Sequence, residues 1–174
     1  LHILLAEDDP DDRMLTRRAV VESEMAATFA AVKNGQELMR YLHREGDYGS
    51  PEAAPRPDLI LLDLNMPHIN GGRLLKIIRK TWPRIPVIVL TGTIEVDTAV
   101  QCMKIGALDY VVKPVEEDRL VAAVKQALAM EETGETGKKT LHQDLFAQIK
   151  NPAAFRHIIT QDRKMHAIFH YVEA

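Results

Sequence analysis

The sequence predicts an α/β fold built on a parallel β-sheet, and two observations lead to this prediction. Short apolar runs alternate along the chain with segments in which apolar residues recur every three or four positions. That alternation is typical of strand–helix–strand units, which form parallel sheets covered by helices. Four of the runs also end on an acidic, hydroxyl or ammonium side chain. Because ligands of open parallel sheets bind outside the carboxyl ends of the strands, the pattern also predicts a site there.

Five strands are expected from the apolar runs. They lie at residues 3–6, 28–32, 59–62, 87–90 and 110–112. The run at residues 59–62 is continuously aliphatic, as strands buried on both faces are. The run at residues 28–32 is only weakly apolar, which favours a place nearer an edge of the sheet.

Five helices are expected between and after the strands, where apolar residues recur at helical spacing. They fall at residues 14–21, 38–42, 70–82, 96–105 and 120–130. In the first helix, the apolar face is expected to contain Met14, Leu15, Ala19, Val20 and Val21. Residues 44–57 contain three prolines and two glycines and are interpreted as an exposed loop, longer than usual.

Residues 1–130 are assigned to one domain, and residues 131–174 to a linker and a helical extension. Residues 131–139 have no apolar periodicity, whereas Leu145, Phe146 and their neighbours resume helical spacing. With 174 residues and 46% hydrophobic content, the chain has material for one full core plus an appendage.

Composition argues against several classes of function. A net charge of −3 lacks the basic excess of a nucleic-acid-binding surface, so this fragment is expected to bind no nucleic acid. The single cysteine, Cys102, excludes an internal disulfide and fits a reducing compartment. No apolar run approaches the ~20 residues of a membrane span, and no signal peptide precedes Leu1. We therefore expect a cytoplasmic protein with no membrane partner.

Acidic side chains at two strand ends predict a metal site. Glu7 and Asp8 follow the first strand, and Asp63 follows the third. Two carboxylates ~4 Å apart repel each other by about 4 kcal/mol at an effective dielectric constant of 20, so a divalent cation is needed between them. Oxygen ligands of this kind suit Mg²⁺. The acids within residues 9–12 are better explained as caps at the positive end of the following helix.

Asp63, Thr91 and Lys113 are the candidates for phosphoryl chemistry. An aspartate carboxylate can attack phosphorus and form an acyl phosphate. Lys113 ends a buried strand, where an unpaired ammonium is costly, so it needs an acid nearby, and Asp63 is the candidate. Thr91, beside Gly92, offers a hydroxyl and an approachable backbone N–H to phosphoryl oxygens.

Six motifs in chain order together resemble the receiver domain of two-component response regulators. They are Glu7-Asp8-Asp9-Pro10, Leu62-Asp63-Leu64-Asn65-Met66-Pro67, Gly71-Gly72, Leu90-Thr91-Gly92, Gly106-Ala107-Leu108-Asp109-Tyr110 and Val112-Lys113-Pro114. The resemblance covers residues 2 to about 128. It implies a flavodoxin-like (βα)5 doubly wound parallel sheet, and a signalling domain that is not an enzyme beyond its own phosphorylation and dephosphorylation.

The resemblance implies that Asp63 accepts a phosphoryl group from a sensor histidine kinase. It further implies that Mg²⁺ is held by Asp8, by Asp63, by the backbone carbonyl of Asn65 and, through a water molecule, by Glu7.

The remaining matches concern the response to phosphorylation. Thr91 and Lys113 match the residues that sense the phosphoryl group, and Tyr110 matches the aromatic residue that turns inward on activation. The Lys113–Pro114 peptide bond is expected to be cis, which X–Pro bonds in tight turns can be.

The end of the chain carries a second resemblance. Residues 155–160 and 165–174 resemble the opening of the AAA+ domain of sigma-54-dependent transcription activators. The full-length protein is then expected to bind DNA and sigma-54 RNA polymerase. Because exposed apolar stripes usually find a partner, we also expect a homodimer through the fourth and fifth helices and the linker, with Leu145 and Phe146 buried between the two chains.

Two other interpretations remain open at this point. The chain could be a stand-alone receiver that acts by docking to partners, with an incidental helical tail. It could also be a metal-dependent phosphohydrolase. Steady phosphate release from a generic phosphomonoester would favour the hydrolase, whereas a longer reading frame encoding a P-loop would favour the sigma-54 activator.

Overall fold

The computed structural model describes residues 1–132 except 24, 68–69 and 93–95. Over this part of the chain, strands and helices alternate as predicted. In chain order the elements are β1 (His2–Ala6), α1 (Pro10–Glu22), β2 (Thr28–Val32), α2 (Gly35–His43), the 3₁₀ helix η1 (Gly46–Tyr48), β3 (Leu59–Asp63), α3 (Gly71–Thr81), β4 (Val87–Thr91), α4 (Val96–Ile105), β5 (Asp109–Val112) and α5 (Glu117–Glu132).

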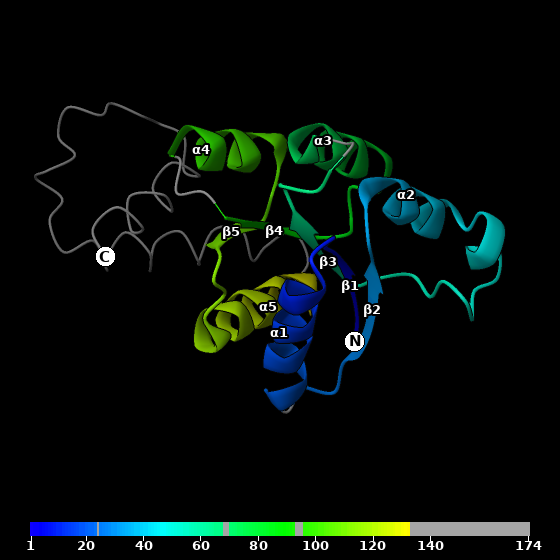
Figure 1. The fold of residues 1–174 in the computed structure, drawn as a ribbon, viewed down its shortest axis with the longest axis horizontal. Coiled ribbons are helices and arrows are strands. Elements are labelled where there is room, and N and C mark those ends of the chain that lie inside the picture. The colour runs from blue at the N-terminus through cyan, green and yellow to red at the C-terminus, as the bar shows by residue number, and fades with distance from the viewer. Residues whose placement is uncertain (24, 68–69, 93–95, 133–174) are drawn as a thin grey trace, which may run out of the picture.

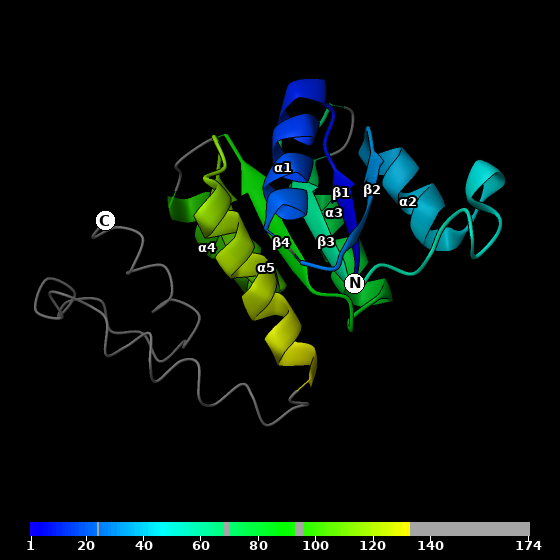
Figure 2. The same ribbon diagram turned by 90° about the horizontal axis from the view of Figure 1, so that it is seen from below.

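The strands form one parallel sheet in the order β2-β1-β3-β4-β5. Helices α2, α3 and α4 cover one face of the sheet, and α1 and α5 cover the other, which gives three layers (Figure 1). Figure 2 shows α1 and α5 lying side by side across the sheet. The strand order reverses direction between β1 and β3, and in doubly wound sheets this switch point is where ligands bind. The predicted flavodoxin-like fold is confirmed.

Each strand supplies two cores, because successive side chains point to opposite faces of the sheet. In β1, Leu4 and Ala6 pack under α2 and α3, while Ile3 and Leu5 pack under α1 and α5. Strands β3 and β4 are buried at every position. The predicted burial of residues 59–62 is therefore confirmed.

Side-chain oxygens cap the first three helices. Asp9, Asn34 and Asn70 each accept hydrogen bonds of 2.8–3.2 Å from backbone N–H groups in the first turn of α1, α2 and α3. The capping role expected for Asp9 is confirmed. Gly106 directly follows α4, and its φ of 113° favours glycine.

The prediction for the inner face of α1 is wrong at three positions. Met14, Leu15 and Val21 are 63%, 54% and 58% exposed, whereas Ala19 and Val20 are buried as predicted. Helical spacing alone could not separate the two faces, because apolar residues occur on both.

The prediction of an exposed loop at residues 44–57 is also wrong in part. The chain forms η1, and Tyr48 packs on Tyr41 of α2 with ring centroids 5.2 Å apart. Ala54 is 1% exposed and belongs to the core under α2 and α3, and Pro57 is buried as well. The segment is therefore anchored to the domain at both ends.

The predictions for residues 133–174, including Leu145 and Phe146, lie outside the described residues. Cys102 is a buried free thiol. Among the helices that the structure describes, none combines the length and apolar character that a membrane crossing requires.

Candidate functional site

The predicted site residues meet at the carboxyl edge of the sheet. Glu7 directly follows β1, Asp63 and Thr91 are the last residues of β3 and β4, and Lys113 directly follows β5. The parallel register aligns these ends, with Ala6 opposite Leu62 and Thr91 opposite Val112. Side chains from four strands therefore converge on one place beside the switch point.

The Lys113 ammonium lies among three carboxylates. Its Nζ is 2.5 Å from Glu7 Oε2, 2.9 Å from Asp12 Oδ2 and 3.3 Å from Asp63 Oδ2. Lys113 therefore has the acidic neighbour that its position requires. The expected partner, Asp63, is the most distant of the three, and Glu7 is the nearest.

Burial controls the electrostatics of this cluster. Burial raises the pKa of Glu7 to about 7, although the hydrogen bond from Lys113 opposes the rise. Burial alone would lower the pKa of Lys113, but its hydrogen bonds to Glu7 and Asp12, together with the charge of Asp63, raise that pKa above its usual value. The Lys113 ammonium is thus held in its charged form.

Three carboxylates also lie close enough to share a cation. Ligand oxygens of Glu7, Asp8 and Asp63 lie within 4.8 Å of one another. Glu7 and Asp63 are 0% and 1% exposed, while Asp8 is half-buried. One ammonium cannot balance this charge, and carboxylate oxygens are hard ligands, so the residues fit a divalent cation.

The loop after β3 orients Asp63. The backbone N–H of Asn65 donates to Asp63 Oδ1 at 3.1 Å, while that of Leu64 donates to the Leu90 carbonyl at 3.0 Å and continues the pairing with β4. A Cβ placed on Gly92 would lie 3.2 Å from Asn65 Nδ2, so the two loops that follow β3 and β4 are in close contact. A carboxylate held this way presents one oxygen to a backbone donor and the other to Lys113.

Thr91 and Tyr110 are both buried. Thr91 is 1% exposed, and its carbonyl accepts the backbone N–H of Lys113 at 2.7 Å. Tyr110 is 7% exposed and belongs to the core that includes Met103 and Ala107. The Lys113–Pro114 bond is cis, as expected.

Sequence reasoning missed two contributions from the first turns of α1. The sequence favours a capping role for Asp12, but its carboxylate pairs with Lys113. No motif in the sequence points to Arg13, whose Nη1 donates to the carbonyls of Glu7 and Asp8, each at 2.9 Å. A signal was present in the spacing, because residues in the first two turns of a helix lie above the loop that precedes it.

Comparison with known proteins identifies the family of this chain. Residues 3–125 match the model of the response regulator receiver domain. The chain is 32% identical over 127 residues to the DNA-binding transcriptional regulator NtrC of Escherichia coli (strain K12), and the match covers 73% of this chain and 24% of that protein. The chain therefore spans about a quarter of the length of this relative.

Solved structures of response regulators are also similar to this chain. The bacteriophytochrome response regulator RtBRR is 38% identical, with a TM-score of 0.65 over 72% of this chain and 76% of its own. The Mn²⁺-bound form of response regulator Rcp1 is 30% identical, with a TM-score of 0.60 over 70% of this chain and 88% of its own. The chain belongs to the response regulator receiver family, and its signalling role in a phosphorelay follows from that membership.

Proposed function

We propose that Asp63 is the residue that accepts the phosphoryl group in this receiver. The observation that carries the proposal is the environment of its carboxylate. The group is almost fully buried at the end of β3, its Oδ1 accepts a backbone N–H, and its Oδ2 lies 3.3 Å from a lysine ammonium. A buried carboxylate aimed at a strand-end crevice and faced by a fixed cation suits attack on an anionic phosphoryl group.

The proposed cofactor is Mg²⁺, which would be held by Asp8, Asp63 and the backbone carbonyl of Asn65, with Glu7 acting through a water molecule. The close approach of three carboxylates supports this assignment. Rcp1, a structural relative, is described as Mn²⁺-bound. When bound, the ion would neutralise charge on the carboxylates and on the incoming phosphoryl oxygens.

In the proposed reaction, an Asp63 carboxylate oxygen attacks the phosphorus of a phosphohistidine on a sensor kinase. The new O–P bond forms as the P–N bond breaks, and the imidazole nitrogen leaves with the electron pair. Lys113 and the Thr91 hydroxyl would then bind phosphoryl oxygens. Two or three charge-assisted hydrogen bonds at ~1.5–3 kcal/mol each match the ~5.5 kcal/mol needed to shift a two-state equilibrium from 1:99 to 99:1.

The proposed output of the switch is a change in the surface made by α4, β5 and α5. Thr91 ends β4 and Tyr110 lies in β5, so both are placed to link the site to that surface. On the activated surface, the Tyr110 ring would be turned inward.

The experiment measures phosphorylation with acetyl phosphate and Mg²⁺. We expect one acid-labile acyl phosphate per chain and none in Asp63→Asn. Asp8→Asn should bind Mg²⁺ more weakly and should therefore need a higher Mg²⁺ concentration for labelling. Asp11→Asn is the matched control, because Asp11 is an exposed acid in the first turn of α1. Equal labelling of Asp63→Asn and the wild-type protein would exclude the assignment.

The kinase is proposed to dock beside the site, on α1. Met14 and Leu15 expose apolar surface there, close in sequence to Asp12, which pairs with Lys113. Exposed apolar side chains next to a reactive site are suited to a protein partner. Met14→Glu should slow transfer from a kinase but leave phosphorylation by acetyl phosphate unchanged, whereas slowing of both would exclude docking as the cause.

We further propose that residues 1–130 act as the receiver of a longer protein. Residues 131–174 would then be the linker and the start of the AAA+ domain of a sigma-54-type activator that binds DNA and RNA polymerase. Similarity to NtrC, a DNA-binding transcriptional regulator, supports this. A homodimer through α4, α5 and the linker belongs to the same proposal. Sedimentation of residues 1–174 should reveal a dimer, with weaker association after truncation at Met130, and two monomeric species would contradict it.

A further inference from the structure

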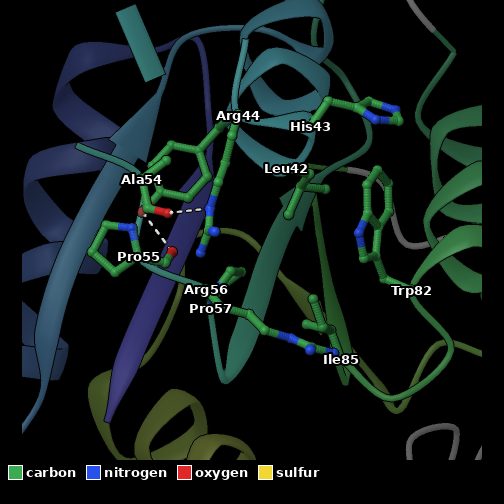
Figure 3. Close-up of a pocket in the computed structure, with 10 residues that line it drawn as sticks. Leu42, His43, Arg44, Ala54, Pro55, Arg56, Pro57, Trp82 and Ile85 are labelled. Atoms are coloured by element: carbon green, nitrogen blue, oxygen red, sulfur yellow. Dashed lines mark hydrogen bonds between the residues drawn. The ribbon is translucent and has the colours of Figure 1, made fainter. Parts of the chain in front are cut away.

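A cavity lies at the edge of the sheet opposite to Asp63. Its volume is about 250 Å³, and its walls come from the end of α2, the segment before β3 and the turn between α3 and β4. Figure 3 shows Trp82 and His43 facing Arg44, Ala54 and Pro55 across the opening. Five residues of β3 at ~3.3 Å each separate this edge from the phosphoryl site, so the two sites share no side chain.

The floor of the cavity is fixed by packing and hydrogen bonds. Ala54 and Ile85 are 1% and 3% exposed and belong to the core. The hydroxyl of Tyr41 donates to the Pro55 carbonyl at 3.1 Å and lies 2.7 Å from His2 Nε2. Ala54 and Pro55 are therefore anchored to the domain and form one wall of the cavity.

Two arginines supply positive charge to the cavity. Arg44 Nε donates to the Ala54 carbonyl at 3.3 Å, a bond that does not use the two terminal guanidinium nitrogens. Within the described part of the chain, no carboxylate forms an ion pair with Arg44 or Arg56. Glu52 interacts electrostatically with Arg44 but forms no ion pair with it. On a chain of net charge −3, two guanidinium groups at one cavity favour an anionic ligand.

The backbone at Arg44 supports a role for its side chain. Arg44 caps α2 with φ 57° and ψ 54°, the left-handed conformation that glycine adopts most easily. It is the one non-glycine residue with positive φ in the described part of the chain. An unfavourable backbone conformation held by surrounding structure is a reason to suspect function.

An aromatic wall completes the cavity. The Trp82 indole packs edge-on against His43, with ring centroids 4.9 Å apart and an interplanar angle of 67°. Trp82 is half-buried, so part of its indole faces the opening. Trp offers apolar area and Arg a planar, charged fork, and both are enriched among the residues that dominate binding at protein interfaces.

We propose that this cavity binds a small organic anion that carries one oxyanion group on a planar apolar body. The oxyanion, a carboxylate or a phosphate, pairs with Arg44 and Arg56, and the apolar body lies against Trp82 and Ile85. The volume suits this class of ligand, since a cavity of about 150 Å³ holds a benzene ring and the remainder accommodates the charged group.

Trp82 is the only tryptophan in the chain, so its fluorescence reports on this cavity alone. The protein is titrated at constant ionic strength with benzoate, phenyl phosphate, neutral benzamide and inorganic phosphate. We expect a saturable change with benzoate or phenyl phosphate, and the tighter of the two identifies the preferred oxyanion. Benzamide and inorganic phosphate should bind at least about tenfold more weakly, since each lacks one half of the interaction.

Variants test the two arginines. Arg56→Gln and Arg44→Gly should each weaken the aryl anion about tenfold or more, and Arg17→Gln, an exposed arginine on α1, should leave binding unchanged. Because glycine suits the left-handed position, Arg44→Gly keeps the fold, which a thermal melt verifies. No saturable change, equal binding of benzamide or inorganic phosphate, or unaltered binding by the arginine variants would overturn the proposal.

Discussion

Replacing Lys113 with methionine tests whether its ammonium neutralises the acidic cluster. Methionine has a similar length and no charge, so Lys113→Met leaves Glu7, Asp12 and Asp63 without the cation that they share. The Lys113 side chain is 12% exposed and that of Glu7 is 0% exposed, so water can replace little of the lost interaction.

The expected loss follows from this burial. Removing one partner of a buried ion pair lowers the free energy of unfolding by about 3–5 kcal/mol, and the partial access of water to Lys113 favours the lower value. We therefore expect a loss of about 3 kcal/mol at pH 8 without added metal. The loss should shrink at lower pH, because burial raises the pKa of Glu7 to about 7, and a protonated Glu7 no longer needs a counterion.

The sign of this pH dependence can be worked out from linkage. A group whose pKa is raised in the folded state adds stability below its unfolded pKa of about 4.5, and this contribution is lost as pH rises through about 7. In the wild-type protein, the hydrogen bond from Lys113 lowers the pKa of Glu7. Without this bond the pKa of Glu7 rises, so the variant continues to lose stability at higher pH. The gap between variant and wild type should thus widen from pH 5.5 to pH 8.

Urea unfolding with and without Mg²⁺ provides the measurement. A ligand that binds only the folded state adds about 2.7 kcal/mol at 100 times its dissociation constant, so Mg²⁺ should restore much of the stability of Lys113→Met. Lys104→Met, an exposed position on α4, is the matched control and should change little. A loss below 1 kcal/mol at pH 8, or a loss that grows as pH falls, would refute the reasoning.

Three further predictions concern other parts of the domain. Thr91→Ala should still accept phosphate but lose the phosphorylation-dependent change in amide hydrogen exchange over α4, β5 and α5, and an unchanged response would separate Thr91 from the switch. Gly71→Ala should lower the free energy of unfolding by about 1–3 kcal/mol, because its Cβ would lie 2.6 Å from the Leu64 Cα. Gly72→Ala should be neutral or stabilising by up to about 1 kcal/mol. Equal effects of the two substitutions in urea unfolding would contradict this prediction. Burial lowers the pKa of His2, so the contribution of His2 to stability is present above about pH 6.5 and is lost as the pH falls below this value. His2→Gln should therefore make stability, measured by thermal melts, depend less on pH below about 6.5. An unchanged pH dependence would exclude the effect.

The sheet and the meeting of the site residues could be predicted from the sequence because both depend on order along the chain. A run of buried aliphatic residues such as 59–62 has few alternatives to a central strand, and parallel strands bring their carboxyl ends to one edge. Asp63 and Lys113 therefore had to be neighbours once the strands were placed.

Distances within the site and the faces of α1 could not be predicted in the same way. They depend on side-chain direction and on which helix packs where, and neither is encoded in spacing alone. Asp12 pairs with Lys113 because α1 begins directly above the site. Met14 and Leu15 are exposed because α5 meets α1 along the stripe of Ala19 and Val20.

The two hydrogen bonds from Arg13 connect α1 directly to the backbone of Glu7 and Asp8. One guanidinium nitrogen holds the carbonyls of Glu7 and Asp8, so a displacement of the helix pulls on the loop that positions two of the proposed metal ligands. A partner that binds α1 can therefore alter the affinity of the proposed site for its metal ion. Thermodynamic reciprocity then requires the ion to alter how strongly that partner binds, so the concentration of free metal would set which fraction of receivers is ready to be engaged.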